Sequence, residues 1–127
     1  MAIPRLPDAE LTIMKIVWRI NSSDVTSAQI TKELEGKKEW AVTTVLNFLS
    51  RLVDRGFLSV RRNGKTNIYT PLIDEDMYLK KETKSFLERL HGNSLKSLVA
   101  SLYEGEAVTK KDLAELSSYI DEYATDK

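Results

Sequence analysis

Short polar side chains gather on one face of the helix that we expect over residues 41–55. Thr43 and Asn47 lie four residues apart and therefore share a face of its first turns, with Thr44 beside them. Asparagine can make two hydrogen bonds to adenine, and threonine can bond a base or touch a thymine methyl. We expect these three side chains to contact DNA bases, and the alternative is an ordinary polar helix face.

Basic residues follow at positions from which a protein can bind phosphates. Two candidates, Arg51 and Arg55, lie toward the end of the predicted helix. Three more, Arg61, Arg62 and Lys65, lie around the tip of a predicted hairpin. Asn63-Gly64 is a strong hairpin signal. Of two registers we prefer a three-residue turn through Lys65, because it places Val60 opposite Ile68. For each basic residue the alternative is a merely solvated position.

Apolar spacing indicates the elements that must position these side chains. Over residues 41–55 the apolar residues recur at intervals of three and four, which predicts one buried face made of Val42, Val45, Phe48, Leu49, Leu52 and Val53. Gly56 is expected to end this helix in a left-handed cap. Residues 57–62 then begin a strand, and Pro71 closes its partner.

Two helices precede this one. The first should begin after Pro7, and the second should run from about Ser27 to Glu35 and stop at Gly36, because Thr26 and Gln29 have capping-box spacing. Their predicted buried residues are Leu11, Met14, Val17 and Trp18 in the first helix and Ile30 and Leu34 in the second. Three helices followed by a small antiparallel hairpin form the order of a winged helix-turn-helix.

After Pro71 the apolar pattern becomes three thin stripes. One helix should extend from the acidic start at residues 74–76 to His91-Gly92, the next from Ser94 to Gly105, and the last from a cap at Thr109. Stripes this thin make a poor monomer core, so we expect a second copy to cover them. The predicted dimer interface comprises Leu95, Leu98, Val99, Leu102, Leu113, Leu116, Ile120 and Tyr123. The predicted fold is thus mainly α, with a winged-helix DNA-binding domain over residues 1–73 and a three-helix dimerisation domain over residues 74–127.

The charge distribution agrees with that division. Residues 1–73 hold 11 basic and 7 acidic residues, a net charge of +4, whereas residues 74–127 hold 8 and 12, a net charge of −4. A basic module suits phosphate, and an acidic one does not. The chain has no cysteine, no signal peptide and no membrane-length apolar run, so we expect a cytoplasmic protein without membrane insertion.

Enzyme chemistry finds no support in the sequence. No phosphate-binding glycine loop, metalloprotease motif or nucleophile elbow is present, and we expect no cofactor and no metal. The acidic run at residues 74–76 is explained by the helix dipole. A hydrolase that uses scattered carboxylates such as Asp74 is a distant alternative. A protein-interaction module, with Leu46 and Phe48 as exposed anchors, is a closer one.

Over nearly its whole length the chain resembles the penicillinase and methicillin-resistance repressors of the BlaI/MecI type. The matching segments are Leu11 to Trp18, Trp40 to Leu58 with its Arg51-Leu52 and Arg55-Gly56-Phe57-Leu58 elements, and Asn93-Ser94-Leu95 leading to Ser97-Leu98-Val99. The resemblance implies a homodimeric repressor that binds double-stranded DNA at a palindromic operator. The genes under control would be those of β-lactam resistance.

The resemblance also implies a mode of induction. When a membrane sensor protease meets a β-lactam antibiotic, such a repressor is cut in its C-terminal module, at the position that matches Ser101-Leu102 here. The best-known members have an Asn-Phe pair there, and basic residues where this chain has Thr43 and Leu46. A repressor of other genes that is not controlled by cleavage is therefore the alternative. Without cysteine, the chain cannot sense copper as one branch of the family does.

Overall fold

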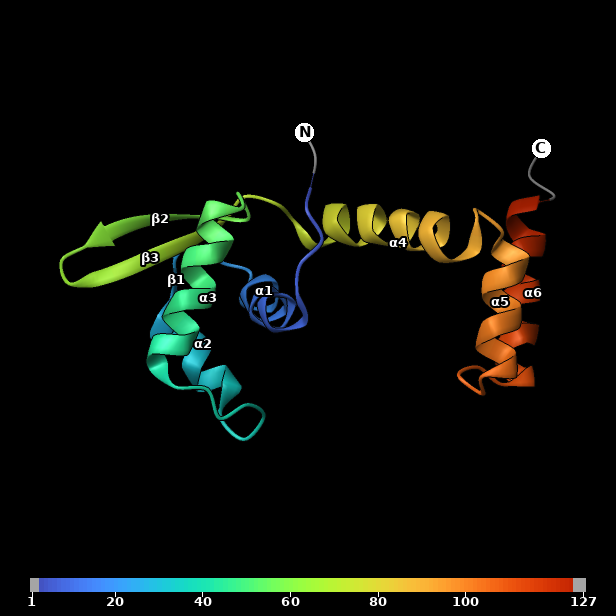
Figure 1. Ribbon diagram of the computed structural model, residues 1–127, viewed down its shortest axis with the longest axis horizontal. Helices are drawn as coiled ribbons and strands as arrows, with labels where there is room; N and C mark the ends of the chain where they lie inside the picture. Colours follow the sequence, from blue (N-terminus) through green and yellow to red (C-terminus); the bar gives the residue numbers. More distant parts are fainter. Residues whose placement is uncertain (1–2, 125–127) are drawn as a thin grey trace. The chain divides into compact units, whose positions relative to one another are not determined.

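The computed structural model describes residues 3–124 and shows a mainly helical chain with a small antiparallel sheet (Figure 1). The elements in order are α1 (Asp8–Ile20), β1 (Val25–Thr26), α2 (Ser27–Leu34), α3 (Val42–Asp54), β2 (Leu58–Asn63), β3 (Thr66–Pro71), α4 (Glu75–His91), α5 (Leu95–Glu104) and α6 (Lys110–Ala124). The predicted order of three helices, a hairpin and three further helices is confirmed. Strand β1 was not predicted.

The ends of α1 and α2 follow from local chemistry. Acidic residues in the first turn of α1 suit the positive end of the helix dipole, and Asn21 ends α1 in a left-handed conformation with φ of 53°. The predicted capping box of α2 is present. The backbone N–H of Gln29 donates to the Thr26 hydroxyl at 3.2 Å, and the Thr26 N–H donates to the Gln29 side chain at 2.9 Å.

Helix α3 packs on the core through Val45, Leu49 and Leu52, which are fully buried. Gly56 has the predicted positive φ, +83°, and the Phe57 N–H donates to the carbonyl of Leu52, as in a Schellman cap. The expectation that Val42 is buried is wrong, since this residue is 58% exposed. Val42 is the first residue of α3, and the core-facing row begins one turn later.

The sheet has the order β1-β3-β2, and its hairpin turn is shorter than predicted. Asn63 pairs with Thr66 across a two-residue turn, Gly64-Lys65, and Val60 pairs with Tyr69. The expected three-residue turn and the pairing of Val60 with Ile68 are therefore wrong. Gly64 takes a positive φ of 65° at the first turn position, and tight two-residue turns of this kind match the twist of the flanking strands.

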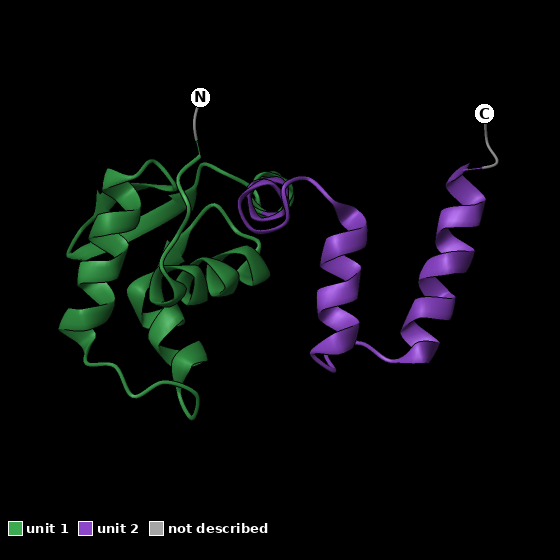
Figure 2. Cartoon of the chain, turned by 45° about the vertical axis from the view of Figure 1, so that its right-hand side comes forward, with its two compact units in different colours: residues 1–82 green, residues 83–127 purple. Residues whose placement is uncertain are grey.

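The chain divides into two compact units, residues 1–82 and residues 83–127, and the division falls inside α4 (Figure 2). In the first unit the backbone N–H of Leu6 donates to the Tyr78 hydroxyl at 2.9 Å, and the Tyr78 ring lies 5.6 Å from that of Phe57. These contacts hold the first turns of α4 on the core of the first unit. The predicted functional boundary after residue 73 stays a prediction.

The second unit holds an antiparallel pair of helices, α5 and α6 (Figure 2). Neither helix has a buried residue. The two helices line an apolar groove of about 480 Å³ with Leu95, Lys96, Val99, Ala100, Tyr103, Leu113, Leu116 and Ile120. As predicted, Ser94 and Thr109 lie at the helix starts, where their hydroxyls accept from the backbone N–H of Ser97 and Asp112.

Candidate nucleic-acid interface

The predicted base-contacting residues lie where α3 is open to solvent. Thr43 and Asn47 are exposed, and Thr44 is half-buried beside them. Arg51, one turn further on, is exposed, and its guanidinium lies 5.8 Å from the centre of the Phe48 ring. The structure thus gathers these four residues on or beside one face of α3, and their contact with DNA stays a prediction.

The basic residues of the hairpin are also open to solvent. Arg62 donates through Nε to the Gly64 carbonyl at 3.3 Å, which draws its guanidinium toward the hairpin turn that also carries Lys65. Arg61 is different, because its Nη2 forms an ion pair with Asp24 Oδ1 at 2.6 Å. A phosphate would therefore compete with the Asp24 carboxylate for the Arg61 guanidinium.

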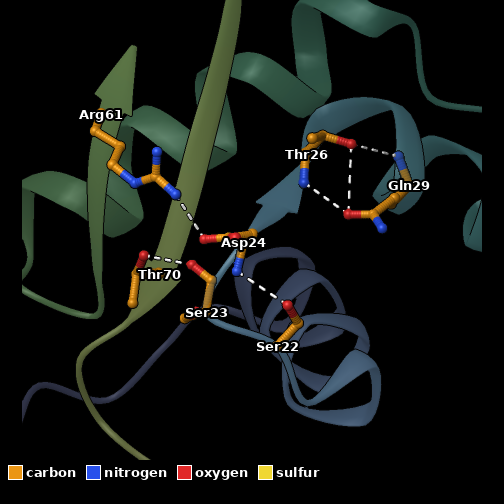
Figure 3. Close-up of polar contacts among 7 residues, drawn as sticks. All are labelled: Ser22, Ser23, Asp24, Thr26, Gln29, Arg61 and Thr70. Atoms are coloured by element: carbon orange, nitrogen blue, oxygen red, sulfur yellow. Dashed lines mark hydrogen bonds and ion pairs between the residues drawn. The ribbon is translucent and has the colours of Figure 1, made fainter. Parts of the chain in front are cut away.

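A set of polar contacts ties the hairpin to the loop before α2 (Figure 3). Besides the Arg61–Asp24 pair, the Thr70 hydroxyl donates to the Ser23 carbonyl at 2.6 Å. Within the loop, the backbone N–H of Asp24 donates to the Ser22 hydroxyl at 3.0 Å. Strand β1 then pairs with β3 directly. These contacts fix the hairpin relative to the start of α2, so β2 and β3 form an anchored wing.

One predicted phosphate ligand has a structural partner. The Arg55 guanidinium pairs with the carboxylate of Glu10, which is 1% exposed. A buried carboxylate needs such a partner, because an unpaired buried charge is costly. The ion pair therefore gives Arg55 a role in holding α3 against α1, and its contact with phosphate stays a prediction.

Sequence reasoning missed two features of this surface. Asp24 gave no signal, because its partner lies 37 residues away and the pairing of β1 with β3 was not foreseen. The other feature is a hollow of about 530 Å³, whose lining residues are Thr26, Ser27, Ala28, Leu46, Lys65, Thr66 and Asn67. Leu46, which lines this hollow, is exposed as predicted.

The residues expected to form a protein-docking surface separate in the structure. Leu46 is 37% exposed, whereas Phe48 is half-buried with its ring 5.2 Å from that of Trp40. Phe48 is therefore not the exposed anchor that the docking alternative requires.

In the second unit the predicted interface residues are open. Four of them are exposed, namely Leu95, Leu102, Ile120 and Tyr123, and four are half-buried, namely Leu98, Val99, Leu113 and Leu116. Ser101 and Leu102, at the predicted cut, are both exposed within α5. Within residues 3–124, the helices lack the combination of length and hydropathy that a membrane-spanning helix needs.

Three packed helices, a wing anchored beside them and an exposed polar face on α3 define a winged-helix protein of the DNA-binding class. A family model described as penicillinase repressor matches residues 6–122. The chain belongs to the penicillinase repressor family. This family consists of DNA-binding transcriptional repressors, so the predicted repressor class is confirmed and the hydrolase alternative is set aside.

Relatives with known names support the assignment. The chain is 32% identical to the penicillinase repressor of Bacillus licheniformis, over 98% of this chain and 96% of that protein. It is 24% identical to the methicillin resistance regulatory protein MecI of Staphylococcus aureus strain N315, over 91% of this chain and 92% of that protein. Both alignments span the two compact units.

Solved structures resemble the N-terminal part. The solution structure of the DNA-binding domain of the repressor BlaI is 36% identical and has a TM-score of 0.52, covering 61% of this chain and 92% of that one. The Bacillus licheniformis BlaI monomer, solved in complex with the blaP half-operator, has a TM-score of 0.50 at the same identity and coverage. The predicted N-terminal winged helix is thereby confirmed.

Proposed function

We propose that this chain is a cytoplasmic homodimer that represses a β-lactam-resistance gene by binding a palindromic operator in double-stranded DNA. The observation that carries the proposal is the exposed face of α3 with Thr43 and Asn47, placed beside a wing that carries Arg61, Arg62 and Lys65. In this arrangement α3 enters the major groove, and the basic side chains contact the backbone. The similar BlaI monomer was solved with a half-operator, which supports the same use of this surface.

Dimer formation is supported by the second unit. Its two helices α5 and α6 contain no buried residue, and they line an apolar groove of about 480 Å³. A helix pair of this size cannot bury enough apolar surface alone. A second copy of the chain covers these side chains most simply, because in a two-fold dimer the same self-complementary patch serves both subunits.

A palindromic operator follows from the two-fold symmetry of such a dimer. Two linked winged helices bind two half-sites with one loss of translational freedom, so the dimer binds far more tightly than two separate heads. The operator occupancy of the repressor then depends on an intact dimer.

Induction in the proposal is a cut between Ser101 and Leu102 by a membrane sensor protease. Both residues are exposed, and Leu102 lies on the apolar stripe of α5. A break there divides α5, removes α6 from the covalent chain and weakens the dimer. The heads then leave the operator one at a time.

The proposal is tested by selecting duplexes from a random pool with the purified full chain and by measuring its mass by sedimentation equilibrium. We expect a dimer and an enriched inverted repeat. The centres of its half-sites should lie about 10 base pairs apart, which is one helical turn, or a multiple of that distance. A monomer that enriches no sequence overturns the proposal. A dimer that enriches a direct repeat would contradict the palindrome alone.

A further inference from the structure

Two exposed apolar side chains share α3 with the residues expected to contact bases. Leu46 is 37% exposed and Val42 is 58% exposed, and they lie four residues apart in the first two turns. They therefore form a row along the helix. Thr43 and Asn47, each one position later, form a second row that is polar. Helix α3 thus presents an apolar row and a polar row to solvent, side by side.

The core of the first unit does not need the apolar row. Val45, Leu49 and Leu52 are fully buried and fix α3 on α1 and α2, so Leu46 and Val42 are free to serve the outer surface. A single exposed apolar side chain is ordinary on a protein surface and indicates nothing by itself. This row is informative because of its place, in the first turns of α3 beside the candidate base contacts Thr43 and Asn47.

The surroundings of Leu46 indicate the charge of its partner. Leu46 lines the hollow of about 530 Å³ between the start of α2, α3 and the wing. Among the described residues that line this hollow, Lys65 is the charged one, and the others are small, polar or apolar. A hollow with this lining suits a polyanion whose surface also offers apolar groups.

We propose that Leu46, flanked by Val42, contacts the 5-methyl group of a thymine in the major groove and thereby helps to select A·T pairs. This inference rests on the proposed function, because it concerns the same DNA-binding surface. In the major groove an A·T pair presents adenine N7 and N6 beside thymine O4 and the methyl group. The Asn47 amide can pair with an adenine edge while the apolar row covers a methyl group of the same or the next pair.

The same contact disfavours guanine. A leucine that faces guanine N7 and O6 covers two acceptors and supplies no donor, and an uncompensated polar group costs binding energy. A leucine therefore selects for thymine by attraction and against guanine by desolvation.

A protein partner is the rival occupant of the apolar row, and the structure favours DNA. The Phe48 ring is covered by Trp40, so the exposed apolar surface around Leu46 reaches no further along α3 than Val42, and Thr43 and Asn47 border it. A narrow apolar row between polar groups matches isolated methyl groups better than the broad apolar centre of a protein interface.

The experiment replaces each thymine of the selected duplex in turn by deoxyuridine, which keeps every hydrogen-bonding atom and lacks only the methyl group. We expect the wild-type full chain to bind about fourfold more weakly at one or more positions of each half-site, which is the loss of ~0.8 kcal/mol for one buried methyl-sized group. Leu46→Ala should bind the thymine and deoxyuridine duplexes equally at such a position. Val60→Ala, which truncates a 44% exposed apolar residue on β2, is the matched control and should keep the wild-type difference.

The outcomes separate this inference from the proposed function. Wild-type binding that is unchanged at every thymine-to-deoxyuridine position overturns the thymine contact and leaves operator binding intact, and this measurement needs no variant to fold. A Leu46→Ala chain that still distinguishes thymine from deoxyuridine at the sensitive position also overturns it. A chain that selects no duplex overturns the proposed function and this inference together.

Discussion

The Glu10 carboxylate of α1 is 1% exposed, and it is paired with the guanidinium of Arg55, the residue that caps the C-terminus of α3. The pair joins α1 to α3 through two residues that lie 45 positions apart in the sequence. Because α3 carries the candidate base contacts, this pair fixes the far end of the helix that we propose to enter the major groove.

Replacing Arg55 by methionine should destabilise the first unit by about 3 kcal/mol, because it leaves the Glu10 carboxylate buried without a partner. The side chain of Arg55 is 37% exposed, so the loss should fall at the lower end of the range for buried pairs. Urea unfolding followed by tryptophan fluorescence measures it, since Trp18 packs against this core. Arg62→Met makes the same chemical change on the wing and should alter stability by less than about 0.5 kcal/mol. Equal losses for both variants would contradict the structural role of the pair.

Replacing Asp24 by asparagine should tighten DNA binding by about 1 kcal/mol. The slope of log affinity against log salt concentration should become steeper by up to about one unit. The carboxylate competes with phosphate for Arg61, and both partners are more than half exposed, so folding stability should change by less than about 1 kcal/mol. Fluorescence anisotropy at several salt concentrations measures both effects. In an Arg61→Ala background the same substitution should bring little gain, and a full gain there would show that Asp24 does not act through Arg61.

The parts of the fold that depend on neighbouring residues were predictable. The capping box of Thr26 and Gln29 and the left-handed glycine at 56 are decided within a few residues, and both predictions are confirmed. The hairpin register was not decided locally. Strand β3 also pairs with β1, where Val25 lies opposite Tyr69, so the face of β3 that meets the core is set by a segment more than 40 residues away.

In the candidate site, too, the sequence predicted the features that depend on neighbouring residues and missed those that depend on distant segments. The exposure of Thr43 and Asn47 follows from helical periodicity, because the buried row of α3 lies on the other side. The partners of Arg55 and Arg61 lie on α1 and in the loop before β1, so only the folded chain shows which arginine is held by a buried carboxylate and which by an exposed one.

Replacing Asn47 by alanine should remove about 1 to 3 kcal/mol of discrimination between the selected base and its competitors at one position of each half-site. The amide is the group on α3 that can bond adenine at two atoms. Competition between duplexes that differ at single positions measures the loss. Asn63→Ala removes an exposed amide from the wing strand β2 and should leave base preference unchanged. An unaltered preference in the Asn47 variant would show that Asn47 does not contact a base.

Replacing Leu116 by aspartate should weaken the dimer by about 3 kcal/mol or more, because a charge is placed in the apolar groove between α5 and α6. Sedimentation equilibrium measures the shift toward monomer. Leu72→Asp introduces the same charge at an exposed leucine of the first unit and should leave the mass unchanged. A Leu116 variant that remains as dimeric as the wild type would exclude this groove from the interface.

Cutting the chain between Ser101 and Leu102 should lower affinity for the complete operator by about 10² to 10⁴-fold and leave affinity for a single half-site nearly unchanged. The first compact unit ends at residue 82, so the cut lies outside it and the winged helix should remain folded. The cut is best made in the full chain through an inserted site for a sequence-specific protease, with the same chain uncut as the control. The slope of log affinity against log salt concentration should fall to about half its value for the uncut chain, because each released head neutralises only its own phosphates. If the cut chain held the complete operator as tightly as the uncut chain, α5 and α6 would have to remain associated after cleavage, and a break at this position could not by itself release the repressor.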